Sequence, residues 1–255
     1  MRILVTGGAG ALGSLVMAQL RERGHDGVAA SRRSGVDLST GAGIDEATRD
    51  VEAVVHCATS PLHARAVDVG GTRRLVTALA AQPSPPHLVA ISIVGCDLNP
   101  YPYYVAKTAA EGIIMGSGLP ATVVRATQFH SFAALVGRAL TIGPLAFSLG
   151  DMAVQPIDPL WLASRLADAA AGPRPAGPTR GTDLAGPEFL TMAQVASKLC
   201  AHAGRPAPRL VRIPPVGGTL RSFSAHTNLP GPEALTGGLS FSAWLSSQPA
   251  RPRVH

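Results

Sequence analysis

The sequence predicts an α/β fold in which helices flank a doubly wound parallel sheet. Short apolar runs, which are typical of buried parallel strands, alternate with segments of helical periodicity over the first half of the chain. A glycine-rich stretch at residues 6–13 joins the first apolar run to the first helical segment. The hydrophobic content of 46% is sufficient for one large core. We therefore expect a single domain that covers residues 1–255.

The predicted elements of the first half follow one another in strand–helix order. Strands are expected at residues 3–5, 28–31, 36–38, 51–58, 87–94 and 120–126. Helices are expected at residues 15–21, 68–81 and 103–111. Prolines at positions 83, 85 and 86 end the second helix, because proline interrupts helical hydrogen bonding. Residues 1–126 are thus predicted to form a Rossmann-type core.

The strand–helix alternation becomes irregular after Thr127. Helices are expected at residues 129–140, 160–171, 191–203, 216–224 and 241–245, and strands at 152–157, 182–185 and 210–213. Thr191 is predicted to cap its helix. We expect residues 127–247 to form mainly a small C-terminal substrate lobe, and the Pro/Arg-rich residues 248–255 to fray.

Composition argues against several classes of function. The net charge is +6, but the arginines are scattered and no basic run alternates with aromatic residues, so no nucleic-acid partner is expected. No apolar run approaches the roughly 18 residues of a membrane span. The first strand follows Met1 so closely that we expect no signal peptide. Cys57, Cys96 and Cys200 lack metal or disulfide spacing, which predicts no metal and a cytoplasmic location.

The glycine-rich stretch has the spacing of a dinucleotide-binding turn. Gly7, Gly10 and Gly13 fit a G-x-x-G-x-x-G pattern, and Gly8, Gly10 and Gly13 fit G-x-G-x-x-G. Glycine allows a pyrophosphate to lie against the backbone, and the start of the following helix attracts its negative charge. Cofactor contacts are predicted from Thr6, Gly7, Gly10, Ala11, Leu12 and Gly13. A purely structural turn is the alternative.

The end of the second strand predicts which dinucleotide binds. Sites for NAD place an acidic residue there to hold the ribose 2′-hydroxyl, whereas this chain has Ser31, Arg32 and Arg33. Two guanidinium groups and a hydroxyl suit a 2′-phosphate, so NADP(H) is the predicted cofactor. Solvated surface arginines are the alternative. Further cofactor contacts are expected near other strand ends, from Asp37 (at the adenine amine), Leu38, Cys57, Ala58, Thr59, Ala126 and Thr127.

A candidate proton-transfer group follows the fifth predicted strand. Tyr103 and Lys107 lie one helical turn apart, and an ammonium near a phenol favours the phenolate, which would lower the pKa of Tyr103. The tyrosine could then exchange a proton with a carbonyl oxygen that Ser92 holds. Lys107 could also bridge the ribose hydroxyls. Two alternatives stay open: that Tyr104 is the exposed tyrosine, and that the Tyr/Lys pair is ordinary helix surface.

These motifs together resemble the short-chain dehydrogenase/reductase superfamily. The resemblance rests on Thr6-Gly7-x-x-Gly10-x-x-Gly13 and on Tyr103-x-x-x-Lys107. The segments at residues 91–95, 101–107, 125–130, 155–158 and 184–188 are similar to its atypical NmrA-like branch. That branch contains reductases, isomerase-like members and redox sensors, so the resemblance implies NADP binding more directly than any one reaction.

The resulting hypothesis is an NADPH-dependent ketoreductase that acts on an apolar small molecule. A composition rich in Ala, Gly, Pro and Arg suggests a GC-rich bacterial source, where tailoring of polyketides or other secondary metabolites would fit. The alternatives are a non-catalytic NADP-binding redox sensor and a non-redox isomerase, dehydratase or cyclase. A monomer or homodimer is expected.

Overall fold

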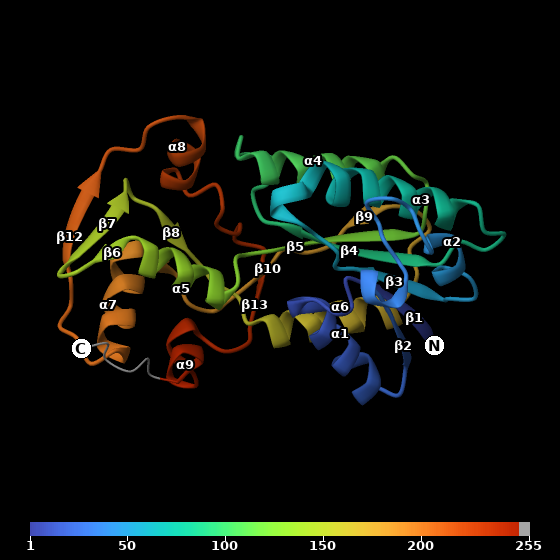
Figure 1. The fold of residues 1–255 in the computed structure, drawn as a ribbon, viewed down its shortest axis with the longest axis horizontal. Coiled ribbons are helices and arrows are strands. Elements are labelled where there is room, and N and C mark those ends of the chain that lie inside the picture. The colour runs from blue at the N-terminus through green and yellow to red at the C-terminus, as the bar shows by residue number, and fades with distance from the viewer. Residues whose placement is uncertain (250–255) are drawn as a thin grey trace.

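The structure, a computed structural model that describes residues 1–249, is built on an eight-stranded sheet (Figure 1). The strands lie in the order β13-β10-β5-β4-β3-β1-β2, and β9 pairs with β5. All of these pairings are parallel. The strands are β1 Arg2–Thr6, β2 Asp26–Ala30, β3 Ala53–His56, β4 His87–Ile93, β5 Ala121–Ala126, β9 Thr179–Arg180, β10 Leu184–Ala185 and β13 Leu235–Thr236.

The order of the strands reverses at β1, which pairs with β2 on one side and with β3 on the other. Thr6 ends β1 and lies beside Ala30 of β2 and His56 of β3. Open α/β sheets bind ligands outside the carboxyl ends of their strands at such a reversal. The doubly wound α/β fold predicted from the sequence is therefore confirmed, and the reversal is the place where a site is expected.

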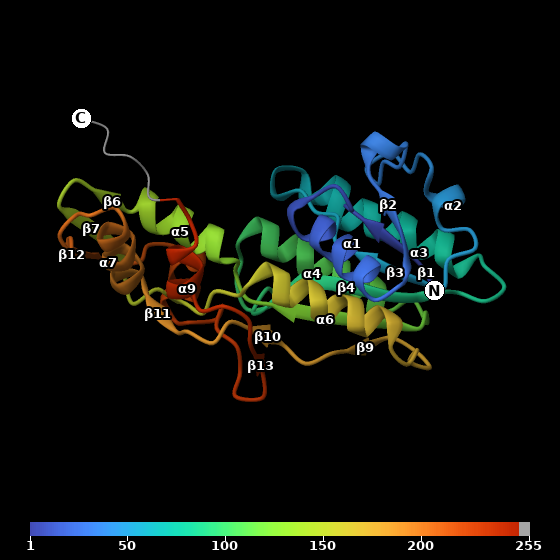
Figure 2. The same cartoon turned by 90° about the horizontal axis from the view of Figure 1, so that it is seen from below.

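Helices cover both faces of the sheet (Figures 1 and 2). Helices α1 (Ala11–Glu22) and α6 (Pro159–Ala171) pack together on one face, while α3 (Thr72–Ala80) and α4 (Pro102–Met115) cover the other. Apolar side chains at helical spacing are fully buried against the sheet, as with Val16 and Leu20 of α1. Burial of each such side chain stabilises the fold by roughly 1.5–3 kcal/mol.

The remaining elements form a lobe at one end of the molecule, beyond the carboxyl ends of the strands (Figure 1). Helices α5 and α7 pack together there, and α7 also contacts α9. Thr191 and Gln194 form a reciprocal capping box at the start of α7, as predicted for Thr191. The elements are α5 His130–Ala139, β6 Thr141–Ile142, β7 Leu145–Leu149, β8 Ala153–Val154, β11 Leu190–Thr191, α7 Met192–His202, β12 Arg209–Ile213, α8 Gly218–Ser224 and α9 Phe241–Ser246.

The second half of the chain contributes to both parts of the molecule. Helix α6 and strands β9, β10 and β13 return to the large sheet, and the lobe is formed by the segments between them. Gly186 shows how closely the two parts pack, because a Cβ at this position would overlap the carbonyl oxygen of Pro156. The predicted tail at 248–255 lies outside the described residues from position 250 onward.

Several predicted elements differ from those observed. The strand expected at 36–38 is only an isolated antiparallel bridge between Asp37 and Ala42. The strand expected at 152–157 shortens to β8, and the helix expected from Asp68 begins earlier, as a π-helical segment at Arg65–Gly71. Helix α2 (Ile44–Ala47) and the β6–β7 hairpin are not predicted from the sequence, since these elements are too short for a clear periodicity.

Within residues 1–249, no helix combines the length and hydrophobicity needed to cross a bilayer.

Candidate active site

The glycine turn after β1 is shaped by close backbone contacts. Gly7 has a φ of +68°, which L side chains rarely adopt, and a Cβ there would lie 2.8 Å from Cα of Ala58. A Cβ on Gly13 would overlap the carbonyl oxygen of Gly7. The turn therefore lets α1 start directly against the end of β1 and beside the residues that follow β3.

The start of α1 is suited to an anion. Gly10 is the N-cap residue, with no side-chain cap, and the first turn of this described helix contains no acidic residue. The first N–H groups of a helix lack intrahelical partners and carry the positive end of its dipole. The glycine turn lies at the strand reversal and its glycines have no side chains, while Ala11 and Leu12 lie in the first turn of the helix. This arrangement fits the diphosphate of a dinucleotide.

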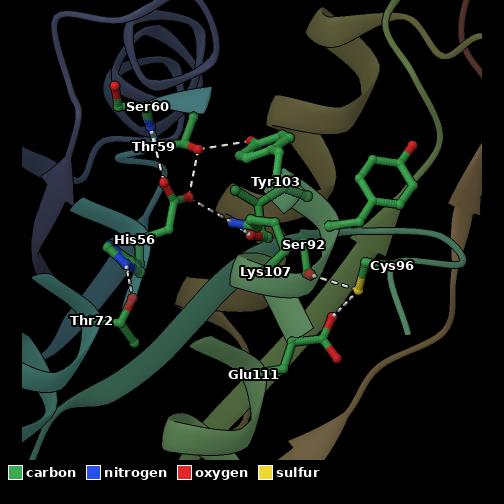
Figure 3. Close-up of polar contacts among 12 residues, drawn as sticks. His56, Thr59, Ser60, Thr72, Ser92, Cys96, Tyr103, Lys107 and Glu111 are labelled. Atoms are coloured by element: carbon green, nitrogen blue, oxygen red, sulfur yellow. Dashed lines mark hydrogen bonds and ion pairs between the residues drawn. The ribbon is translucent and has the colours of Figure 1, made fainter. Parts of the chain in front are cut away.

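His56 ties the strand reversal together beneath this turn. Its Nδ1 lies 2.6 Å from Oγ1 of Thr6, and its Nε2 lies 3.0 Å from Oγ1 of Thr72, as Figure 3 shows for the second contact. Burial, reinforced by the nearby Lys107 ammonium, lowers the pKa of His56 to about 3. The ring is therefore neutral, and the hydroxyl of Thr6 is engaged in a buried contact.

The residues after β2 present two exposed arginines. Arg32 and Arg33 lie in a short 3₁₀ helix (Arg32–Ser34), which Ser31 precedes, and the Ser31 N–H donates to Oγ of Ser34 at 2.9 Å. Both guanidinium groups are accessible to a ligand at the edge of the strand reversal. Asp37 accepts hydrogen bonds from the hydroxyl and the N–H of Ser39, which together with the charge of Arg32 lower its pKa.

The other predicted cofactor residues divide into buried and accessible groups. Leu38 is a core residue that packs against Gly71, and burial raises the pKa of the Cys57 thiol to about 12. Thr59 is exposed. At the end of β5, Ala126 and Thr127 are buried. Oγ1 of Thr127 has no hydrogen-bond partner within residues 1–249, so this hydroxyl is free to bind a ligand group.

Tyr103 and Lys107 meet two residues from the segment after β3. The hydroxyl of Tyr103 lies 2.7 Å from Oγ1 of Thr59, and Thr59 donates to Oδ1 of Asp68 at 2.6 Å. Nζ of Lys107 lies 3.6 Å from the same carboxylate oxygen and donates to the carbonyl of Ile91 at 2.9 Å. Figure 3 shows the side chains of Thr59, Tyr103 and Lys107 grouped together, with these contacts as dashed lines. Lys107 is only 7% exposed, so it is not an ordinary surface lysine.

The predicted lowering of the Tyr103 pKa is wrong for this arrangement. Burial raises the pKa of Tyr103 to about 12, the hydrogen bond with Thr59 opposes that rise, and the Asp68 carboxylate adds to it. Lys107 is paired with Asp68 and with a backbone carbonyl, so the neighbouring carboxylate offsets its charge. Tyr103 is thus a protonated phenol that can donate a hydrogen bond.

Ser92 lies in a different network. Its hydroxyl is 3.8 Å from Sγ of Cys96, which donates to Oε1 of Glu111 at 3.4 Å (Figure 3). Arg125 binds both carboxylate oxygens of Glu111, at 2.8 and 2.6 Å. Burial alone would raise the pKa of Glu111, but the hydrogen bonds from Arg125 lower it overall. The hydroxyl in contact with Tyr103 is that of Thr59, and a direct role for Ser92 stays a prediction.

Tyr104 points into the interior. It is buried, its hydroxyl accepts a hydrogen bond from Nε2 of Gln128 at 3.2 Å, and its ring meets that of Phe223 edge to face. Burial raises its pKa to about 12. Tyr103 is the more accessible of the two tyrosines.

Sequence reasoning missed Asp68, which is 1% exposed. In the sequence, Asp68 stands at the start of a predicted helix, where acidic residues are common because they interact favourably with the helix dipole. No local signal distinguishes such a residue from one that binds a lysine on another helix. Among residues 1–249, no group of three or more His, Cys, Asp and Glu side chains is placed to hold a metal ion.

The strand order and the flanking helices define a Rossmann-type α/β architecture, and comparisons with known proteins agree with that fold. A family model described as RmlD substrate binding domain matches residues 1–82. No curated protein matches the chain.

Solved structures resemble the chain over nearly its whole length. An NADPH-dependent quinone oxidoreductase from Escherichia coli, complexed with NADPH, has a TM-score of 0.77 at 14% identity, covering 96% of this chain and 98% of that one. A nucleoside-diphosphate-sugar epimerase from Staphylococcus aureus has a TM-score of 0.75 at 18% identity, covering 97% and 100%. A dTDP-4-dehydrorhamnose reductase from Bacillus anthracis, in complex with NADP, has a TM-score of 0.63 at 15% identity, covering 84% of each chain. The predicted resemblance is confirmed at the level of the fold.

Proposed function

We propose that this chain is an NADPH-dependent reductase of a carbonyl group in an apolar small molecule. The observation that carries the proposal is the placement of Tyr103 and Lys107 beside the strand reversal, in contact with Thr59 and Asp68 from the segment after β3. Two structures with the same fold support it: the Escherichia coli protein is an NADPH-dependent quinone oxidoreductase, and the Bacillus anthracis protein is a dTDP-4-dehydrorhamnose reductase.

The chain's own residues provide a place for the cofactor. The glycine turn and the start of α1 would hold the diphosphate, and Arg32 and Arg33 would hold a 2′-phosphate. The unpartnered hydroxyl of Thr127 offers a further polar contact at the carboxyl edge of the sheet. When bound, NADPH supplies a hydride.

Tyr103 would act as the general acid. Its phenol is protonated at neutral pH and would give its proton to the carbonyl oxygen of the substrate. Lys107, which Asp68 and the carbonyl of Ile91 hold in place, would donate to the ribose hydroxyls of the cofactor. The lobe, which we propose receives the substrate, exposes the apolar side chains Phe132 and Leu135 on its first helix, α5, and an apolar substrate is consistent with that surface.

The proposal is tested by two measurements on the purified protein. Titration calorimetry with NADPH, NADP, NADH and NAD should show binding with a preference for the phosphorylated cofactors. Loss of NADPH absorbance should then be followed with a panel of quinones and aromatic ketones, such as 9,10-phenanthrenequinone and menadione. If the protein binds neither NADP nor NADPH, the whole proposal is contradicted. If it binds NADPH but no carbonyl compound oxidises the bound cofactor, the reductase assignment is contradicted.

A non-redox reaction is the second candidate, because several similar structures are sugar-nucleotide epimerases. Such an enzyme would convert its substrate with only catalytic amounts of cofactor and no net loss of NADPH. Product analysis by mass spectrometry and NMR, at a cofactor concentration far below that of the substrate, distinguishes the two reactions.

A further inference from the structure

Asp68 lies at the centre of a set of hydrogen-bond donors. The π-helical segment Arg65–Gly71 carries its carboxylate to a position that is 1% exposed. Oδ1 accepts from Thr59 at 2.6 Å and lies 3.6 Å from Nζ of Lys107, while Oδ2 accepts from the N–H of Ser60 at 3.1 Å. All three partners are donors, which is the complement that a carboxylate requires.

This arrangement fixes the direction of the hydrogen bonds. A hydroxyl has one hydrogen, and that of Thr59 is directed to Oδ1 of Asp68. While Tyr103 is protonated, its phenol is therefore the donor and Oγ1 of Thr59 is the acceptor in their 2.7 Å contact. Once the phenolate forms, the Thr59 hydroxyl can turn and donate to it, which is the hydrogen bond that lowers the pKa of Tyr103. Before the reaction, each donor therefore points from Tyr103 through Thr59 to Asp68, and Asp68 lies beside Lys107.

We propose that Thr59 and Asp68 form a proton relay that connects Tyr103 to Lys107. This inference rests on the proposed function and deepens it, because it names the residues that return a proton to the general acid. Thr59 would be in direct contact with that acid, and Asp68 would act through Thr59 and Lys107 as a positioning and relay residue.

The proton balance of the relay is simple. When the carbonyl carbon accepts the hydride with its electron pair, the C=O double bond becomes a C–O single bond and the oxygen takes the proton of Tyr103. The Lys107 ammonium gives a proton to Oδ1 of Asp68, and the resulting carboxylic acid passes it to Oγ1 of Thr59. As Oγ1 receives that proton, the Thr59 hydroxyl, turned toward Tyr103, gives its own proton to the phenolate. Asp68 is then a carboxylate again, and the neutral amine of Lys107 takes up a proton from solvent. One solvent proton is consumed for each carbonyl reduced.

Two variants of Thr59 distinguish loss of proton transfer from a change in side-chain packing. Thr59→Val keeps the shape of the side chain and removes the hydroxyl, whereas Thr59→Ser keeps the hydroxyl. With 9,10-phenanthrenequinone and NADPH, we expect kcat to fall on the order of 100-fold in Thr59→Val, and to stay within a few-fold of wild type in Thr59→Ser. Asp68→Asn, which cannot accept the same proton, should resemble Thr59→Val.

Two further kinetic measurements test for proton movement itself. In mixtures of H₂O and D₂O, a relay that moves several protons makes the wild-type rate depend on the deuterium fraction in a curved manner, and Thr59→Ser should keep that curve. In Thr59→Val the pH profile of kcat should change as well. The titratable groups that face the relay are Tyr101, Tyr103 and Lys107 on and next to α4, with His56 and Cys57 on and after β3.

A measurement without cofactor or substrate completes the test. Ultraviolet absorbance reports phenolate formation, and the difference between each protein and its own Tyr103→Phe version isolates Tyr103. Asp68→Asn should move the Tyr103 titration to lower pH, because the carboxylate opposes the phenolate. Thr59→Val should move it to higher pH, because a hydrogen bond to the phenolate is lost.

The outcomes distinguish this inference from the proposed function. If the wild-type protein reduces the quinone but both Thr59→Val and Asp68→Asn keep its kcat and pH profile, the relay is wrong and the reductase assignment stands. If the wild-type protein reduces no carbonyl, the proposed function fails, and the cofactor-free titration decides the relay. In that case, an unchanged titration of Tyr103 in both Thr59→Val and Asp68→Asn would overturn the relay.

Discussion

The Tyr103 and Thr59 hydroxyls lie 2.7 Å apart, although α4 carries one and the segment after β3 carries the other. The contact is possible because β3 and β4 are parallel neighbours, so their following segments emerge at the same edge of the sheet. The same edge holds the glycine turn after β1. The sheet topology thereby brings together a candidate proton donor and a candidate diphosphate cradle.

Removing the Tyr103 hydroxyl should abolish most of the proposed carbonyl reduction. In Tyr103→Phe the ring remains but the general acid is lost, so we expect kcat to fall by about 10²–10⁴-fold. Steady-state assays with NADPH and 9,10-phenanthrenequinone measure this effect. Tyr101→Phe is the matched control, because Tyr101 precedes the same helix, and it should retain wild-type kcat. If kcat falls equally in the two variants, or does not fall in Tyr103→Phe, Tyr103 is not the general acid.

Removing the two arginines after β2 should weaken NADPH binding selectively. Charge-assisted hydrogen bonds contribute about 1.5–3 kcal/mol each, so Arg32→Ala/Arg33→Ala should raise the Kd for NADPH at least about tenfold. The Kd for NADH should change little, because NADH lacks the 2′-phosphate. Calorimetry with both cofactors measures the difference, with Arg209→Ala, an exposed position on β12 in the lobe, as control. A parallel loss of affinity for both cofactors would show that these arginines do not read the 2′-phosphate.

The sheet could be predicted from the sequence because its strands are buried on both faces and therefore appear as continuous apolar runs. The run at 87–94 corresponds closely to β4, for example. The β6–β7 hairpin could not be predicted, because its strands are short and show no long apolar pattern. Gly143 and Pro144 join them. The positions of the chain's second half depend on contacts between distant segments, such as that between Gly186 and Pro156.

The candidate site was predicted residue by residue but not in its contacts. Spacing along one helix correctly places Tyr103 and Lys107 one turn apart. The partners of that pair come from another element, and no local pattern indicates that Asp68 neighbours Lys107. The loop after Ser92 is likewise set by a distant contact, because a Cβ on Gly95 would overlap the carbonyl oxygen of Thr227. That tertiary constraint cannot be inferred from residues 92–103 alone.

Enlarging Gly13 should disrupt the turn after β1. A Cβ there would overlap the carbonyl oxygen of Gly7, so Gly13→Ala must displace backbone atoms. We expect a lower free energy of unfolding, by about 1–3 kcal/mol, and weaker cofactor binding. Gly112→Ala in α4 is the matched control, since its Cβ would meet no atom within 4 Å. That substitution should leave stability unchanged or raise it by up to about 1 kcal/mol. Urea unfolding of both variants, with calorimetric titration of NADPH, checks this; if the two alanines behave alike, the close contact at Gly13 does not constrain the turn.

The free energy of unfolding should fall as the pH is lowered below about 6.5, because of His56. This loss begins at a higher pH than the titration of ordinary carboxylates. The folded-state pKa of His56 is about 3 against 6.5 for the free side chain, because the ring is buried without charge between Thr6 and Thr72. Below pH 6.5 the unfolded chain therefore binds a proton that the folded chain does not, so stability from this group is present above 6.5 and is lost as the pH falls toward 3. The expected slope is about 1.4 kcal/mol per pH unit in this window. Urea unfolding at several pH values measures it. In His56→Gln the slope should diminish, while replacement of the exposed His63 by Gln should preserve it. A wild-type slope that survives in His56→Gln would show that the acid sensitivity arises elsewhere, and that the ring does not link the strands as a neutral group.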